Sequence, residues 1–114
     1  MRLALVLLAG AALLGAAPAQ AGAGKTVRIY DNYFLPDRLT VDRGATVVWR
    51  WPGPEAAGDV HDVKLASGPK GARRFHSEAA STDYTFRRKL KVPGRYRVVC
   101  TLHTEMRMTI TVRR

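Results

Sequence analysis

The feature that most constrains the fold of this chain is a series of short segments, after residue 24, in which apolar and polar residues alternate. A period of two residues places successive side chains on opposite faces of a β-strand. The segments expected as strands lie around residues 27–29, 39–41, 46–51, 60–65, 84–86, 96–100 and 108–112. Turn formers such as Asp42-Arg43-Gly44 and Pro93-Gly94 separate them, and no segment shows a convincing helical period. The pattern predicts one all-β domain, an antiparallel sandwich or barrel of about seven short strands.

The first residues have the organisation of a secretory signal peptide. Arg2 precedes an apolar run over residues 3–14, and Ala19-Gln20-Ala21 forms a small-x-small cleavage site. A membrane anchor is the alternative, but a spanning helix needs about 20 apolar residues and this run is shorter and broken by glycine. We therefore expect residues 1–21 to be removed. Residues 22–114 would then be an exported protein, periplasmic or extracellular, without stable membrane insertion.

The composition limits the number of domains and the kinds of cysteine site that the chain can form. The chain has 114 residues and is 46% apolar, so it can build one small core but cannot form a multidomain enzyme. Its single cysteine, Cys100, excludes an internal disulfide and any metal site made of cysteines alone. An unpaired thiol in an exported protein is either buried and inert or bound to something.

Metal-binding side chains lie close to that cysteine in the sequence. Cys100, His103 and Met106 fall within one short stretch, in which Cys100 ends one expected strand and His103 and Met106 lie on the loop before the last strand. His61 lies 39 residues upstream of Cys100. One thiolate, two imidazoles and a weak axial thioether are the ligands of blue-copper electron-transfer sites. Zinc suits this set less well, because a thioether is not among its usual ligands. The sequence therefore predicts a copper site.

The arrangement resembles the cupredoxin family, the plastocyanin-like small blue copper proteins. The similarity runs from about residue 25 to residue 114, and the segments that carry it include Leu39-Thr40-Val41-Asp42-Arg43-Gly44, Val60-His61-Asp62-Val63 and Gly94-Arg95-Tyr96-Arg97-Val98-Val99-Cys100-Thr101. The short gap between His103 and Met106 is similar to that of the amicyanin branch. The resemblance implies a Greek-key β-sandwich of about seven to eight strands. It also implies one copper ion, Cu(I)/Cu(II), bound by His61, Cys100, His103 and Met106.

Met108 is the alternative to Met106 as the axial ligand. It is separated from Ile110 and Val112 by even numbers of residues, so its side chain should face the same side of the last strand and belong to the core. Met106 precedes that strand and is free to face the metal, and the amicyanin-like spacing agrees. We therefore favour Met106.

Asp62 and His76 are polar residues outside the expected ligand set. In the family, the residue after the first histidine ties its segment to the cysteine-bearing one, so the resemblance implies a contact between Asp62 and Thr101. A solvent-facing Asp62 is an equal alternative. His76 has no partner at ligand spacing and is interpreted as solvated.

The resemblance implies a one-electron carrier between redox partner proteins, and not an enzyme. The alternative is an exported protein that scavenges or delivers copper with the same ligands. A Cys–His hydrolase is disfavoured, because no third group is evident to orient His103. We expect a monomer that does not bind nucleic acid, since the chain has no nucleic-acid-binding motif.

Charge is unevenly distributed along the chain. The formal net charge is +10, and residues 64–97 hold ten Lys or Arg residues against two acidic residues. This stretch is suited to steering a redox partner with an acidic docking surface. The alternative is a solvated face on which strand-flanking cations, such as Arg87-Arg88-Lys89, prevent edge pairing.

Overall fold

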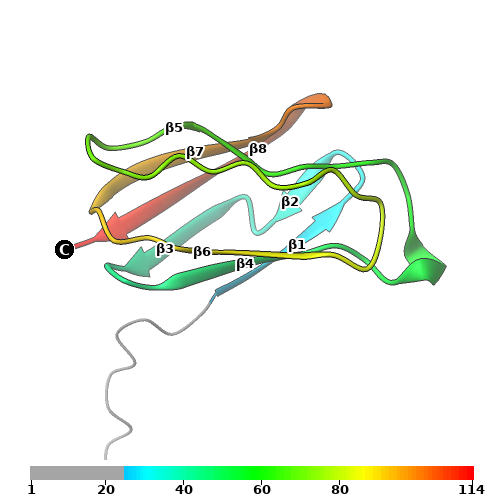
Figure 1. Ribbon diagram of the computed structural model, residues 1–114, viewed down its shortest axis with the longest axis horizontal. Coiled ribbons are helices and arrows are strands. Elements are labelled where there is room, and N and C mark those ends of the chain that lie inside the picture. The colour runs from blue at the N-terminus through cyan, green and yellow to red at the C-terminus, as the bar shows by residue number, and fades with distance from the viewer. Residues whose placement is uncertain (1–24) are drawn as a thin grey trace, which may run out of the picture.

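Two four-stranded β-sheets packed face to face make up the computed structural model, which describes residues 25–114 (Figure 1). One sheet has the order β2 (Tyr33–Leu35), β1 (Lys25–Tyr30), β4 (Thr46–Arg50) and β6 (Thr85–Lys89). The other has the order β3 (Arg38–Asp42), β8 (His103–Arg113), β7 (Gly94–Cys100) and β5 (Lys64–Ser67). A short 3-10 helix, η1 (Pro54–Ala56), interrupts the long connection from β4 to β5. The predicted all-β sandwich is confirmed, whereas the predicted signal peptide lies outside the described residues.

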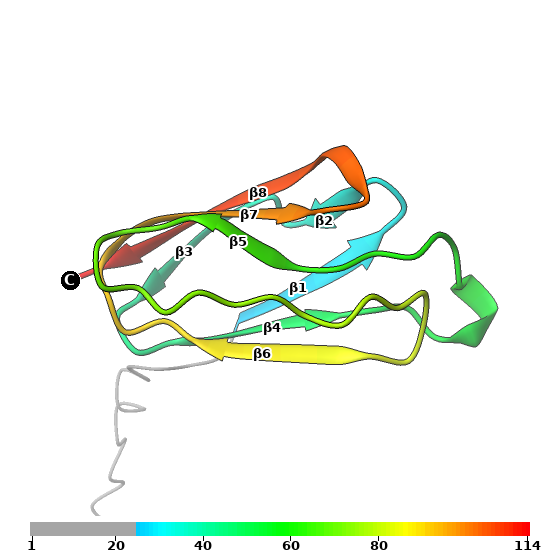
Figure 2. The ribbon, with the colours of Figure 1, turned by 45° about the horizontal axis from the view of Figure 1, so that its top comes forward.

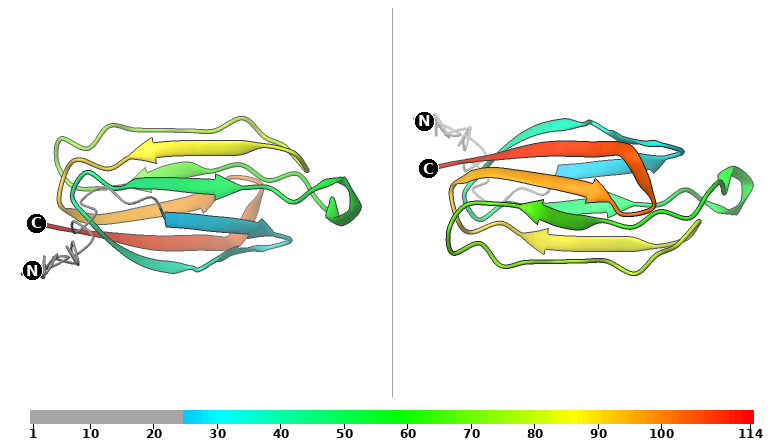
Figure 3. Two further views of the ribbon diagram at one scale, coloured as in Figure 1. Left: turned by 90° about the horizontal axis from the view of Figure 1, so that it is seen from below. Right: turned by 90° about the horizontal axis from the view of Figure 1, so that it is seen from above.

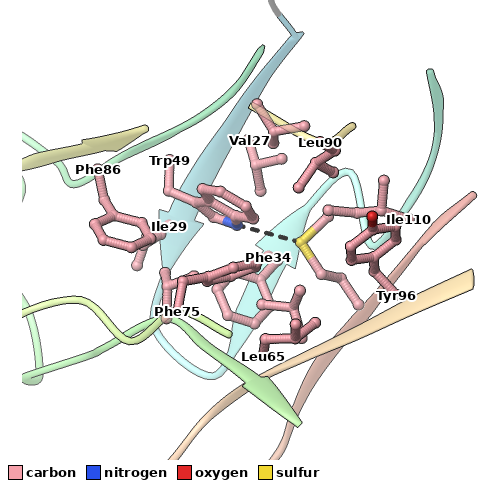
Figure 4. Packing of buried hydrophobic residues seen from close by; sticks show 14 of the residues in the cluster. Val27, Ile29, Phe34, Trp49, Leu65, Phe75, Phe86, Leu90, Tyr96 and Ile110 are labelled. Carbon is pink, nitrogen blue, oxygen red and sulfur yellow. Dashed lines mark hydrogen bonds between the residues drawn. The ribbon is translucent and has the colours of Figure 1, made fainter. Parts of the chain in front are cut away.

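The core lies between the two sheets, as the two-residue alternation predicts. β1 buries Val27 and Ile29, and β4 contributes Trp49 from the neighbouring strand. The Trp49 ring lies 5.7 Å from the ring of Phe75 and 5.8 Å from that of Phe86, measured between centroids (Figure 4). Removing these apolar surfaces from water provides the main driving force for folding.

Strand orientation differs from the purely antiparallel arrangement that the alternation suggested. β1 pairs with β4 in parallel, and β3 pairs with β8 in parallel, while the other neighbours are antiparallel. Figure 3 shows the β1–β4–β6 side of the sandwich in one view and the β5–β7–β8 side in the other. An alternating pattern identifies a strand but carries no information on the direction of its partner.

Two strands have boundaries that differ from the prediction. The strand expected over 60–65 begins only at Lys64, because His61 leaves the sheet and exchanges two backbone hydrogen bonds with Ala80 instead. The last strand begins at His103 and not near residue 108, because the chain reverses within two residues after Cys100 and pairs again at once. His103 and Met106, expected on a loop, therefore lie in β8.

The connections at one end of the sandwich come from three distant parts of the sequence. The β1–β2 turn, the connection from β4 to β5 and the β7–β8 turn lie at this end, whereas the β6–β7 turn lies at the other end with the C-terminus (Figure 2). Among the described residues, no helix has the length and apolar character needed to span a bilayer.

Candidate metal centre

The end that carries the β7–β8 turn brings together three of the four predicted ligands. One ligand atom from each of His61, Cys100 and His103 lies within 4.8 Å of the other two. The Cys100 Sγ atom is 3.9 Å from His61 Nδ1 and 3.6 Å from His103 Nδ1. The two imidazole rings are 4.7 Å apart between centroids. Both Nδ1 atoms thus face one sulfur.

Burial differs among these three side chains. His61 is 2% exposed and Cys100 is 3% exposed, whereas the side chain of His103 is 21% exposed. His61 is held in place partly because its carbonyl accepts the indole N–H of Trp51 at 3.2 Å. The site is therefore closed except at His103, which reaches the surface.

Both methionines of β8 lie inside the sandwich. Met106 is 0% exposed and Met108 is 2% exposed, because residues two apart on one strand face the same side. The expectation that Met106 precedes the last strand is therefore wrong. The Met108 sulfur accepts the indole N–H of Trp49 at 3.3 Å, well inside the aromatic core (Figure 4). Met108 is a core residue, as its parity predicted.

Asp62 joins the His61 segment to the turn after Cys100. Its Oδ1 atom accepts the backbone N–H of Thr101 at 2.6 Å, and its Oδ2 atom accepts the Thr101 hydroxyl. His76 Nε2 lies 2.8 Å from the same Oδ2 atom. Asp62 is 4% exposed, so the alternative of a solvent-facing carboxylate is wrong. His76 is half exposed, in agreement with its interpretation as solvated, but it also contacts Asp62, which the sequence did not predict.

The pKa values of Asp62 and Cys100 are shifted in opposite directions. Burial alone raises the pKa of Asp62, but hydrogen bonds from His76 and Thr101 outweigh it and hold that pKa below its usual value. Burial raises the pKa of the Cys100 thiol, and backbone hydrogen bonds at Asp62 and Leu102 oppose that rise only in part. In the metal-free protein the thiol is thus protected from ionisation, and metal binding must displace its proton.

Two carboxylates that the sequence did not single out face the far nitrogens of the histidines. Asp31 Oδ1 lies 2.9 Å from His61 Nε2, and Asp59 Oδ2 lies 3.8 Å from His103 Nε2. Hydrogen bonds from His61 and from the Asp59 amide hold the pKa of Asp31 below its usual value. In the sequence, Asp31 and Asn32 form a pair that is typical of turns, and no spacing links Asp31 to His61.

The donors gathered at this end fit copper. A thiol sulfur and two imidazole nitrogens face one another, with a buried thioether on the adjoining strand. Among the described residues, no carboxylate oxygen belongs to this group of atoms. Soft sulfur together with imidazole suits copper, whereas magnesium and calcium prefer oxygen.

Comparison with known proteins identifies the family. Residues 24–113 match the model of copper-binding proteins of the plastocyanin/azurin family. The chain belongs to this family. Its cofactor is a single copper ion. No curated protein gives a significant sequence match.

Solved structures with a similar fold include small copper proteins and part of a larger enzyme. The chain matches a reduced Cu(I) form of an amicyanin mutant at TM-score 0.67 and 22% identity, over 80% of this chain and 83% of that one. A second reduced amicyanin mutant gives TM-score 0.66 and 23% identity, over 85% and 88%. The Cu-containing nitrite reductase from Thermus scotoductus SA-01 gives 0.66 and 23% over 81% of this chain, which spans only 23% of that reductase. These likenesses show the cupredoxin fold.

Proposed function

We propose that the protein is an exported type 1 copper protein that carries single electrons between redox partners. The observation that supports this most strongly is the buried Cys100 sulfur, with the Nδ1 atoms of two imidazoles at 3.6 and 3.9 Å. In the proposed site, His61 and His103 would bind copper through Nδ1, Cys100 would bind it as a thiolate, and Met106 would supply a weakly bound thioether. This donor set is that of blue-copper centres.

The protein's contribution is to hold these ligands in one geometry. Bound copper supplies the one-electron couple between Cu(II) and Cu(I). Cys100 and Met106 lie on neighbouring strands, and Asp62 fastens the segment of His61 to Thr101. A site fixed in this way moves little when an electron is gained or lost, which favours fast transfer. Burial of most of the ligands also slows loss of the metal, which favours a carrier over a protein that scavenges or delivers copper.

The surface beside His103 is the proposed port for electrons. His103 is the exposed member of the group, and its neighbour Leu102 is 53% exposed. Among residues 25–114, five large apolar side chains are exposed, namely Tyr30, Tyr33, Leu35, Val60 and Leu102, and three of them directly adjoin Asp31, His61 or His103 in the chain. Exposed apolar groups gathered in one region mark a docking surface. We propose that a redox partner contacts this rim.

A cationic groove on another part of the molecule is proposed to steer that partner. Six cations line it, namely Arg73, Arg74, Arg87, Arg88, Lys89 and Lys91. Within the described part of the chain, the only ion pair of a lysine or arginine is that of Arg113 with Asp42, so the groove cations have no acidic partner. The groove extends to the β6–β7 turn, at the end opposite the β7–β8 turn (Figure 2). Its field is therefore suited to attracting an acidic partner from a distance.

Export is proposed from the sequence alone. Residues 1–21 are proposed to be removed after Ala21, which leaves residues 22–114 as the mature copper domain. The intact mass of the protein recovered from the periplasm or the medium of an expressing bacterium checks the cleavage position. A mass that retains residues 1–21 would contradict it.

The function is tested by comparing copper-loaded wild type with Cys100→Ser. Wild type should show an intense copper–thiolate band in the red and should be reduced and reoxidised with its metal retained. Cys100→Ser should lose the band and keep the β-sheet circular dichroism spectrum of the wild type, because serine is similar in size. An unchanged band in Cys100→Ser would overturn the proposal. Ready loss of Cu(I) from wild type to a competing chelator would instead favour copper delivery.

A further inference from the structure

The side chain of Asp31 is the direct partner of the most buried histidine of the site. Asp31 follows β1, and His61 lies 30 residues further along the chain. The Asp31 Oδ1 atom is 2.9 Å from His61 Nε2. An ionised carboxylate only accepts hydrogen bonds, so His61 Nε2 must carry the proton in this contact. In the neutral imidazole, His61 Nδ1 is then left without a proton, and this is the atom that faces Cys100.

The position of the Asp31 carboxylate is fixed by a second contact. The backbone N–H of Asp59 donates to the same Oδ1 atom at 2.9 Å. The carboxylate is therefore held by the connection that leads into His61. Asp31 is half exposed, yet one of its oxygens accepts two hydrogen bonds from this segment.

Gly58 provides the space for that carboxylate. A Cβ atom at position 58 would lie 2.4 Å from both carboxylate oxygens of Asp31, which is closer than such atoms approach in proteins. No other neighbour comes within that distance of the site of the missing Cβ. The absence of a side chain at Gly58 therefore leaves the space that the Asp31 carboxylate occupies.

We propose that Asp31 is a positioning residue for copper, which fixes the tautomer and orientation of His61 and, through its negative charge, favours Cu(II) over Cu(I). The inference rests on the proposed function, since it concerns the same site. A carboxylate that accepts the outer N–H of a ligating imidazole orients the ring and raises its basicity. The more highly charged Cu(II) gains more from this than Cu(I) does.

Asp59 provides a matched control. Its carboxylate lies near the other histidine, but the 3.8 Å separation from His103 Nε2 is too long for a hydrogen bond, and its side chain is 67% exposed. Asp59→Asn and Asp31→Asn therefore remove the same formal charge from the same end of the molecule. Only Asp31→Asn does so at a hydrogen-bonded histidine.

The first measurement is the reduction potential of copper-loaded wild type and variants by voltammetry. Asp31→Asn should lower the affinity for Cu(II) relative to Cu(I) about tenfold, a rise of about 59 mV for one electron. Asp59→Asn should give a clearly smaller rise. Gly58→Ala should raise the potential without changing the charge of the protein, because the added methyl group displaces the Asp31 carboxylate. Equal shifts in the two asparagine variants, or none in Asp31→Asn, would overturn the proposal.

The second measurement uses the metal-free protein, so it does not depend on the proposed function. Nitrogen-15 NMR of wild type should show His61 protonated on Nε2, and Asp31→Ala should show a mixture of tautomers. An unchanged tautomer in Asp31→Ala would overturn the positioning role. A wild type that shows these NMR signals but forms no blue copper site would contradict the proposed function instead.

Discussion

At the scale of single residues, the two methionines of β8 differ in whether the sulfur accepts a hydrogen bond from Trp49. Met106 and Met108 are both buried on the same face of the strand. The Met108 sulfur accepts the Trp49 indole N–H at 3.3 Å, so its thioether is part of the core. Met106 lies two residues nearer to the turn that follows Cys100. It is therefore the methionine proposed to contact copper.

The two methionines should respond differently to replacement by leucine. Met106→Leu should keep the red absorption band and raise the reduction potential, because the axial donor is lost. Met108→Leu should leave the potential unchanged and lower the free energy of unfolding by about 1 kcal/mol, since the Trp49 N–H loses its acceptor. Voltammetry and urea unfolding of both variants measure these effects. The reverse pattern would assign the axial role to Met108.

The structure brings together the predicted residues of rare type, His61, Cys100 and His103, whereas contacts made by common residue types were not predicted. The chain has one cysteine and three histidines, so the spacing of Cys100 and His103 is informative without a structure. Carboxylates are ordinary surface groups, and Asp31 meets His61 only because the β1–β2 turn and the β4–β5 connection lie at the same end. The contact of His76 with Asp62 was missed for the same reason, because it depends on the path of a loop.

At the scale of elements, Asp62 is the connection between the β4–β5 segment and the β7–β8 turn. It accepts two hydrogen bonds from Thr101 and one from His76. Without it, the Thr101 N–H and hydroxyl would lose their acceptor beside the proposed ligands. The Asp62 carboxylate therefore helps to fix the relative position of His61 and Cys100.

Removal of that carboxylate should destabilise the metal-free protein. Asp62→Ala should lower the free energy of unfolding by about 2 kcal/mol, because hydrogen bonds to a buried charged group are lost and a backbone N–H is left without a partner. Asp42→Ala is the control, since it breaks an exposed ion pair with Arg113 and should cost less than about 1 kcal/mol. Urea unfolding followed by tryptophan fluorescence compares the two. Equal losses would mean that Asp62 has no special structural role.

Element-level prediction was limited by information that alternation does not contain. The parity of buried residues correctly placed β1, β4 and β7. It missed the parallel pairing of β1 with β4, because register and direction depend on how distant segments meet. The apolar residues Val60 and Val63 also suggested a strand over 60–65. In the structure the strand begins only at Lys64, and His61 is paired with Ala80 outside the sheet.

At the scale of the whole molecule, the cationic groove and the proposed port occupy different regions. Six of the 19 lysine and arginine residues line the groove, while the apolar rim adjoins His103. Long-range attraction and short-range contact are thus assigned to different surfaces. This separation has a measurable consequence for association rates.

Charge reversal in the groove should slow electron transfer with an acidic partner. Arg73→Glu combined with Arg74→Glu should reduce the second-order rate with an acidic c-type cytochrome about tenfold at low ionic strength, and the difference should vanish in high salt. Arg95→Glu combined with Arg97→Glu changes the charge equally on a different surface, where both residues line a separate hollow with Arg38. Stopped-flow absorbance measures both rates. Equal slowing by the two variants would show an effect of net charge and not of the groove.

Binding of copper through the thiolate of Cys100 is the feature on which the proposed function most directly depends. The decisive measurement is a titration of the metal-free mature chain, residues 22–114, with Cu(II) while the visible spectrum is recorded. The expected result is an intense band in the red that grows linearly and saturates at one copper per chain. A weak, pale-blue spectrum typical of nitrogen and oxygen ligands alone, or a band that fails to saturate at that ratio, would contradict it.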